Sequence, residues 1–297
     1  MNKLIVDRKE ELYTYLRSEL KNKSKNNIKS LLKNNSILVN DKVVNKYNYI
    51  LNIGDVIEVN KVIKNNEFNL EIIYEDEDII VINKPSKILT ISNSREKENT
   101  LYREVSNYLK KENKKVFVIH RLDYDTSGVI MFAKNQRVQK LYQDNWNNLA
   151  KEREYTAVVE GITNDKGHIE SYLKQTKTLL VYSSKDKNGY FSITDYVKVK
   201  NNNKYSLLKI YISTGRRNQI RCHMYDIKHP IVGDNRYKAK TNPYNRLMLN
   251  ASSLSIINPL NNKLMVFKCN TPQTFYELVK WPLIRMVICF YIFIAIF

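Results

Sequence analysis

A polar segment that runs directly into an apolar strand constrains this chain more than any other feature. Residues 120–128 (HRLDYDTSG) bring together two carboxylates, a guanidinium, an imidazole and two hydroxyls, and the apolar run 129–133 follows at once. This order predicts a polar loop that enters a buried strand. One interpretation is a turn in which Asp123 or Asp125 bonds to its own backbone and Gly128 supplies an unusual dihedral angle. The other interpretation is a loop that carries chemistry, and the composition of the segment alone does not exclude the turn.

The pattern His-Arg-Leu-Asp-x-x-Thr-Ser-Gly resembles the signature of the RluA-type pseudouridine synthases. These enzymes break the bond between uracil N1 and ribose C1′, turn the base and rejoin it through C5. The resemblance implies that Asp123 is the catalytic carboxylate, acting as a nucleophile or as a proton acceptor, and that no metal or organic cofactor is needed. Asp125 falls on a variable position. The resemblance also implies substrate-binding roles for the neighbouring motif residues His120, Arg121, Leu122 and Thr126.

A second matching segment, residues 151–161 (KEREYTAVVEG), is predicted to be a strand. Its Tyr155 matches the family's active-site tyrosine, and an aromatic ring there could stack on the extruded uracil. The other interpretation is an ordinary half-buried strand tyrosine, because the chain holds 21 tyrosines.

A third segment, residues 213–223 (STGRRNQIRCH), predicts a turn followed by a helix, and residues 229–234 (HPIVGD) continue the family resemblance. On such a helix Arg217 and Arg221 would share one face. The resemblance implies that Arg221 pairs with Asp123 and is catalytic, because a guanidinium can hold a carboxylate through two parallel hydrogen bonds. Asn218 stands where the family usually has His. Ile220, Arg216 and Arg217 are predicted to bind substrate, although the two arginines could instead be surface residues that touch phosphate.

The charge of the chain indicates a polyanionic partner. Lysine and arginine number 49 against 30 acids, a formal net charge of +19, and such an excess favours RNA. A membrane partner is not predicted, because the basic residues are spread along the chain instead of clustering beside an amphipathic or spanning segment. One concentration lies near the start, where Lys25, Lys29 and Lys33 would form one face of a helix.

The predicted organisation is α+β, with two domains. Residues 1–62, two helices followed by short strands, resemble the small RNA-binding module of ribosomal small-subunit protein four. Residues 63–69 suit a linker. Residues 70–281 predict the catalytic domain, a mixed and largely antiparallel sheet with helices on its faces. Helices are expected at 100–111 and 136–149, and the Asn188-Gly189 pair predicts a hairpin.

Three widely spaced cysteines and four histidines without ligand spacing predict reduced thiols, no metal site and a cytoplasmic protein. No signal peptide is evident at the amino terminus. Residues 282–297 form an apolar tail of unexplained role. A tail anchor, burial against the catalytic domain and an extension without function all fit it. Its apolar run over 283–297 has 15 residues including Arg285, which is short for a membrane span.

The sequence therefore predicts an enzyme that converts uridine to pseudouridine in structured RNA, with no stable protein partner. The amino-terminal module favours large-subunit ribosomal RNA, and transfer RNA is the alternative. A non-catalytic ribosome-assembly factor on the same fold would tolerate loss of Asp123. Glycoside hydrolysis by Asp123 and Asp125 is disfavoured, since it needs two carboxyl groups held about 5 to 9 Å apart across a sugar.

Overall fold

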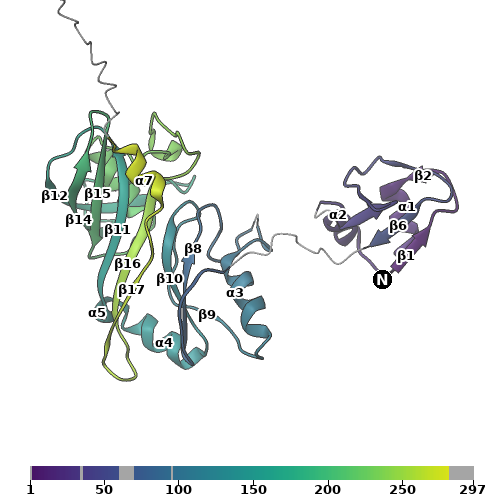
Figure 1. The fold of residues 1–297 in the computed structure, drawn as a ribbon, viewed down its shortest axis with the longest axis horizontal. Helices are drawn as coiled ribbons and strands as arrows, with labels where there is room; N and C mark the ends of the chain where they lie inside the picture. Colours follow the sequence, from purple (N-terminus) through teal and green to yellow (C-terminus); the bar gives the residue numbers. More distant parts are fainter. Residues whose placement is uncertain (1, 34–35, 60–69, 95, 281–297) are drawn as a thin grey trace, which may run out of the picture. The chain divides into compact units, whose positions relative to one another are not determined.

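A computed structural model describes residues 2–33, 36–59, 70–94 and 96–280 (Figure 1). The chain divides into two compact units, Met1–Phe68 and Asn69–Phe297. The predicted linker 63–69 and the apolar tail 282–297 lie outside the described residues, so the boundaries proposed at 62 and 281 stay predictions. Within the described ranges, no helix is long and apolar enough to cross a membrane.

The amino-terminal unit is built on a small four-stranded sheet with two helices. Its strand order is β1-β6-β3-β4, and β2 pairs separately with β5. The turn Asn40-Asp41 between β3 and β4 has positive φ at both positions, 49° and 61°, as a tight two-residue hairpin connection requires. The elements are β1 Asn2–Ile5, β2 Glu10–Glu11, α1 Leu12–Glu19, α2 Lys25–Lys33, β3 Ile37–Val39, β4 Lys42–Val43, β5 Ile50–Leu51 and β6 Val56–Val59.

Helix α2 has the basic face that its sequence predicted, and its other face is apolar. Ile28 and Leu32 are buried in the core of the unit, whereas Lys25, Lys29 and Lys33 are exposed. The apolar spacing accounts for the packing, and the lysines remain in solvent, where a buried ammonium would be costly.

The second unit is built on a large mixed sheet. Among the described residues it has 11 strands, in the order β13-β12-β14-β15-β11-β16-β10-β8-β7, with β17 beside β16 and β9 beside β10. The β10–β16 pair is parallel and the other pairs are antiparallel, as the sequence predicted. The strands are β7 Ile72–Glu75, β8 Ile79–Lys84, β9 Phe117–Val118, β10 Ser127–Ala133, β11 Ala150–Glu160, β12 Lys166–Gln175, β13 Val181–Ser184, β14 Tyr190–Asn201, β15 Tyr205–Ile212, β16 Leu249–Ile257 and β17 Leu264–Lys268.

Helix α3 begins where its capping residue predicts. Thr100 Oγ1 accepts a hydrogen bond from Arg103 N (3.2 Å) at the start of α3, Leu101–Lys110. The helix expected over 136–149 is interrupted at Asn145, giving α4 Gln136–Asp144 and α5 Trp146–Leu149. The others are α6 Gln219–Asp226, the 3₁₀ turn Asn235–Tyr237 and α7 Gln273–Leu278.

The predicted Asn188-Gly189 hairpin was wrong. The pair lies between β13 and β14, but these strands lie on opposite sides of β12 and each is hydrogen-bonded to it. Because β13 and β14 are both antiparallel to β12, they run in the same direction, and the segment between them connects them across β12 without reversing the chain. The local turn signal could not reveal that the long strand β12 lies between the two strands.

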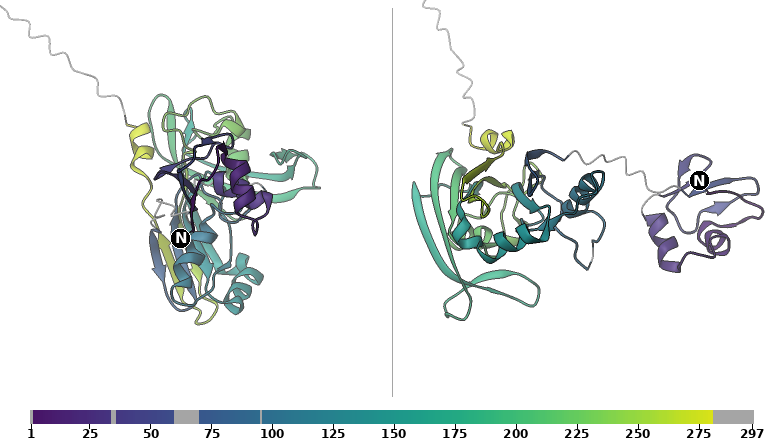
Figure 2. Two further views of the ribbon diagram at one scale, coloured as in Figure 1. Left: turned by 90° about the vertical axis from the view of Figure 1, so that its right-hand side faces the viewer. Right: turned by 90° about the horizontal axis from the view of Figure 1, so that it is seen from below.

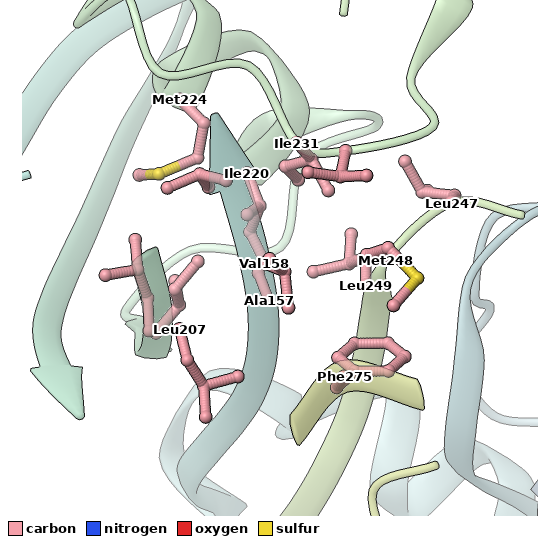
Figure 3. Packing of buried hydrophobic residues seen from close by; sticks show 14 of the residues in the cluster. Ala157, Val158, Leu207, Ile220, Met224, Ile231, Leu247, Met248, Leu249 and Phe275 are labelled. Atoms are coloured by element: carbon pink, nitrogen blue, oxygen red, sulfur yellow. The ribbon is translucent and has the colours of Figure 1, made fainter. Parts of the chain in front are cut away.

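The main core holds α6 against the sheet. Val158 of β11 and Leu207 of β15 pack with Ile220 and Met224 of α6, and Phe275 of α7 belongs to the same cluster (Figure 3). This packing fixes the helix that carries Arg221 relative to the strand that carries Tyr155.

Candidate active site

One row of residues across the sheet brings the distant sequence segments together. Lys84 of β8 lies opposite Gly128 of β10, Gly128 lies opposite Ala251 of β16, and Ala251 lies opposite Tyr155 of β11. Neighbouring strands are about 4.8 Å apart, so this register places the loop before β10 between Lys84 and Tyr155.

Gly128 is required by this arrangement. Its φ is +116°, and a Cβ added there would lie 2.2 Å from the backbone oxygen of Ala251. No other residue type would permit β10 to approach β16 in this way. Beside it, Ser127 Oγ donates to Asn250 Oδ1 (2.6 Å) and accepts from Arg246 (2.8 Å), which fixes the end of the loop.

The backbone on both sides of Asp123 is held by the segment that follows β8. The buried Thr90 Oγ1 donates to Leu122 O (2.9 Å) and accepts from Leu122 N (3.2 Å). On the other side, Tyr124 O accepts from Lys87 N (2.9 Å) and from Lys84 Nζ (3.2 Å). The loop is closed by a hydrogen bond from the backbone N of the buried Thr126 to Asp123 O (3.2 Å).

Lys84 was not predicted as a site residue. Its side chain is fully buried, and its ammonium also donates to Pro85 O (2.9 Å) and Ile88 O (2.8 Å). Burial lowers the pKa of Lys84 to about 7, while the charges of Asp123 and Asp125 raise it. Three carbonyl acceptors use all three ammonium hydrogens, a geometry that favours the charged form. A lysine between a buried apolar strand and Pro85 was the available sequence signal.

Asp123 is partly exposed as a residue, and among the described residues its carboxylate has no hydrogen bond or ion pair. Burial raises the pKa of Asp123. The positive charges of Arg221, Arg217 and Lys84 act in the opposite direction, and Asp125 raises the pKa further. Three cations are thus within electrostatic reach of the carboxylate, and none of them is bonded to it.

The prediction that Arg221 pairs with Asp123 was wrong. Arg221 is buried and forms two hydrogen bonds with Asp234 instead, Nε to Oδ2 and Nη2 to Oδ1, both at 2.7 Å. Asp234 is 1% exposed and also accepts from Tyr237 N. A fully buried carboxylate gains more from a bidentate partner than a partly exposed one does. Arg221 therefore acts on Asp123 through its charge.

The prediction that Arg217 and Arg221 share one face of a helix was also wrong. Helix α6 begins at Gln219, after Asn218 in the left-handed region (φ 50°), so Arg217 precedes the helix and is exposed. Asn tolerates this conformation. Ile220, predicted to bind substrate, is 5% exposed and packs in the main core.

Tyr155 lies where the sequence placed it, on β11, and packs partly against the main core. Burial raises the pKa of Tyr155 to about 12, so the phenol is neutral at physiological pH. The Asp123 charge contributes to the same shift and that of Arg153 opposes it, which indicates that the ring and the carboxylate lie near each other.

His120 contacts neighbouring protein groups, and its predicted contact with substrate stays a prediction. Its Nε2 accepts from Met131 N (3.1 Å), and its ring lies 4.7 Å from that of Trp146, centroid to centroid. Burial lowers the pKa of His120 to about 3, so the imidazole is neutral. Arg121 and Arg216 are exposed, as an RNA contact requires.

The described residues contain no cluster of three His, Cys, Asp or Glu side chains that could hold a metal ion. The absence of a cofactor stays a prediction. The described site offers the carboxylates of Asp123 and Asp125, the aromatic ring of Tyr155 and several cations.

The family model for RNA pseudouridylate synthase matches residues 78–226, a range that includes the 120–128 loop, Tyr155 and Arg221. The chain belongs to this family. It is therefore an RNA pseudouridine synthase, and the fold and enzyme class predicted from the sequence are confirmed. Human RNA pseudouridylate synthase domain containing 1 has a similar fold, with a TM-score of 0.59 over 71% of this chain and 86% of that chain, at 22% identity.

Several relatives of this RNA pseudouridine synthase span nearly its whole length. An uncharacterised RNA pseudouridine synthase of Mycoplasma pneumoniae is 32% identical, covering 90% of this chain and 91% of that protein. Ribosomal large subunit pseudouridine synthase C of Buchnera aphidicola is 30% identical, with coverages of 92% and 93%. Ribosomal large subunit pseudouridine synthase D of Haemophilus ducreyi is 28% identical, with 86% of each chain covered.

Proposed function

We propose that this enzyme converts uridine to pseudouridine in large-subunit ribosomal RNA, with the Asp123 carboxylate acting on a uridine turned out of the RNA. The observation that carries the role of Asp123 is its free carboxylate. Both carboxylate oxygens of Asp234 accept hydrogen bonds from Arg221. Asp123, in contrast, is partly exposed, lies near several cations and is bonded to none of the described side chains. Asp125 lies in the same loop, and the motif position distinguishes the two.

The chemistry balances without a cofactor. The C1′–N1 bond breaks, a C1′–C5 bond forms, C5 gives up a proton and N1 takes one. Asp123 begins either by attacking the ribose or by accepting a proton from it, and both routes start from the ionised carboxylate. The charges of Arg221, Arg217 and Lys84 favour that form. The Tyr155 ring supplies a surface for the extruded base.

The choice of ribosomal RNA is supported by the names of the Buchnera and Haemophilus relatives, which cover most of this chain. The amino-terminal unit adds to it. Its resemblance to the module of ribosomal small-subunit protein four, together with the exposed Lys25, Lys29 and Lys33, supports a role in RNA affinity and placement. We place the reaction in the cytoplasm, where the predicted reduced thiols would persist.

Pseudouridine mapping in cells with and without the gene tests this proposal. We expect one or more large-subunit positions to lose pseudouridine, to regain it with the intact gene, and to stay unmodified with Asp123→Ala. Loss in transfer RNA alone would reassign the substrate. An unchanged pseudouridine map together with a ribosome-assembly defect would favour the non-catalytic alternative.

A separate assay tests Tyr155. Tyr155→Phe keeps the ring and should cost less turnover than Tyr155→Ala. Equal losses would assign the function to the hydroxyl and not to the face of the ring.

A further inference from the structure

Tyr190 presents an exposed aromatic ring on the α6 side of the sheet. It is the first residue of β14 and is 69% exposed. Its cross-strand partner on β12 is Leu173, which is buried in a cluster with Cys222 of α6. Directly opposed residues lie on the same face of a sheet, so the Tyr190 ring is on the face that α6 covers further along. Figure 2 shows the segment between β12 and β14 projecting from the body of the unit.

Arg216 lies over this ring, with its guanidinium carbon 5.2 Å from the ring centroid. The arginine is on a fixed backbone, because Gln219 Oε1 accepts from Arg216 N (3.0 Å) and from Thr214 Oγ1 (2.8 Å). Thr214 in turn accepts from Ile193 N of β14 (3.0 Å). These bonds join the arginine loop to the strand that carries Tyr190, so the two side chains are positioned before any ligand arrives.

The next residue connects this pair to the active site. Arg217 is exposed, and its charge is one of those that lower the pKa of Asp123. The Arg216-Arg217 dipeptide therefore reaches from the ring of Tyr190 to the surroundings of the carboxylate. Extruding a uridine also deprives its neighbouring bases of a stacking partner. An exposed aromatic ring beside a guanidinium is the combination that holds unpaired bases in RNA-binding proteins.

We propose that Tyr190 and Arg216 form a stacking site for an unpaired base that neighbours the target uridine. The proposal rests on the proposed function in one respect, that the uridine enters beside Asp123. It predicts affinity that depends on the presence of a base and not on phosphate charge.

The next residue along β14 supplies a matched control. Phe191 is also an exposed aromatic residue, 39% exposed, but it points to the opposite face and its ring contacts that of Tyr172 (5.3 Å between centroids). Tyr190→Ala and Phe191→Ala therefore remove similar rings from adjacent positions on opposite faces. Tyr190→Trp keeps a stacking surface.

The experiment measures the affinity of the full chain, carrying Asp123→Asn to prevent turnover, for a fluorescein-labelled RNA hairpin. The hairpin loop holds uridines separated by purines, and a second hairpin has abasic sites in place of those purines. We expect Tyr190→Ala to weaken binding to the first hairpin about 5- to 100-fold and Tyr190→Trp to preserve it. Phe191→Ala should have little effect. Against the abasic hairpin, Tyr190→Ala should bind like the parent protein, and its salt dependence should be unchanged on both hairpins.

Equal affinities of the parent and Tyr190→Ala proteins for the first hairpin would overturn the proposal, and so would an equal loss on both hairpins. The second result would indicate a phosphate contact or a change in folding. A Tyr190 variant with normal RNA affinity that loses a protein partner would assign the ring to that partner. Turnover by an Asp123→Ala enzyme would refute the proposed role of Asp123 and leave this binding comparison intact, so the two failures are distinguishable.

Discussion

The two units of this chain differ in what they bury. Among the described residues of the amino-terminal unit, one polar residue, Ser36, is buried, and no charged residue is buried. The second unit buries Lys84, Arg221 and Asp234 completely or nearly so, together with the neutral His223. Burying a charge is expensive, so it is found where a group must be held in one position. RNA affinity can be supplied by lysines in solvent, whereas the isomerisation needs fixed charges.

The largest expected effect comes from Asp123, the carboxylate that we propose reacts with the nucleotide. Asp123→Asn keeps the shape of the side chain but removes its charge, and we expect turnover to fall by roughly 10⁴-fold or more, as when other enzymes lose a nucleophile. RNA affinity and the melting temperature should be unchanged, because the carboxylate bonds to no described side chain. Asp125→Ala should be far milder. If the Asp125 variant were inactive and the Asp123 variant active, the catalytic role would belong to Asp125.

Arg221→Ala should affect both stability and turnover. It leaves the Asp234 carboxylate buried without its partner, which costs about 3 to 5 kcal/mol of unfolding free energy. It also removes one of the charges that keep Asp123 ionised. Denaturant unfolding and single-turnover kinetics would measure the two effects.

The double variant Arg221→Met with Asp234→Asn separates these effects. It removes both charges of the pair, so part of the stability should return while turnover stays low. Recovery of both would mean that Arg221 serves only the fold.

The next prediction concerns Thr90, whose hydroxyl makes two hydrogen bonds to the backbone of Leu122. Thr90→Val keeps the shape of the side chain and removes both bonds. A displacement of about 1 Å at a reacting group can cost on the order of 100-fold, so we expect kcat to fall about 10- to 100-fold while RNA affinity is kept. Thr90→Ser retains the hydroxyl and should restore kcat. A loss confined to KM would exclude a positioning role.

The two units also differ in how much of their structure the sequence predicts. In the amino-terminal unit, the four-residue spacing of Lys25, Lys29 and Lys33 predicted the helix α2. Ile28 and Leu32 are buried on its other face, because burial there follows local periodicity. Strand β1 was missed, since its four residues carry no clear alternation beside a polar start. The resemblance to a known RNA-binding module remains a prediction.

In the catalytic unit the motifs identified the loop and Tyr155, but not the partners of the charged groups. Arg221 was assigned to Asp123, and the greater burial of Asp234 decided otherwise. Thr90 and Lys84 escaped notice because their roles depend on backbone carbonyl and amide groups far along the chain. Such contacts follow from sheet register, which local spacing does not determine.

A smaller effect is expected from Arg217, a charge that is exposed yet acts on the active site. In the proposed mechanism the ionised Asp123 is the reactive form, so turnover should rise with pH through the pKa of this group, which burial raises. Arg217 lowers that pKa, and Arg217→Ala should therefore move the acidic limb of the kcat profile to higher pH. The difference should vanish at alkaline pH, and Arg217→Lys should behave like the parent. An unshifted limb would assign Arg217 to RNA binding alone.

The smallest effect on chemistry is expected from the lysines of α2. Replacing Lys25, Lys29 and Lys33 with Ala should leave kcat at saturating RNA unchanged, because these side chains lie in solvent and in a separate unit. Each lost phosphate contact should reduce the slope of log affinity against log salt by about 0.7 to 0.9, so the three together should reduce it by up to about 2 to 3. The matched control replaces Lys9, Lys42 and Lys46, which are exposed on the same unit outside α2. An equal change of slope in the control would show that net charge acts without regard to position, and a fall in kcat would mean that the amino-terminal unit contributes to the active site.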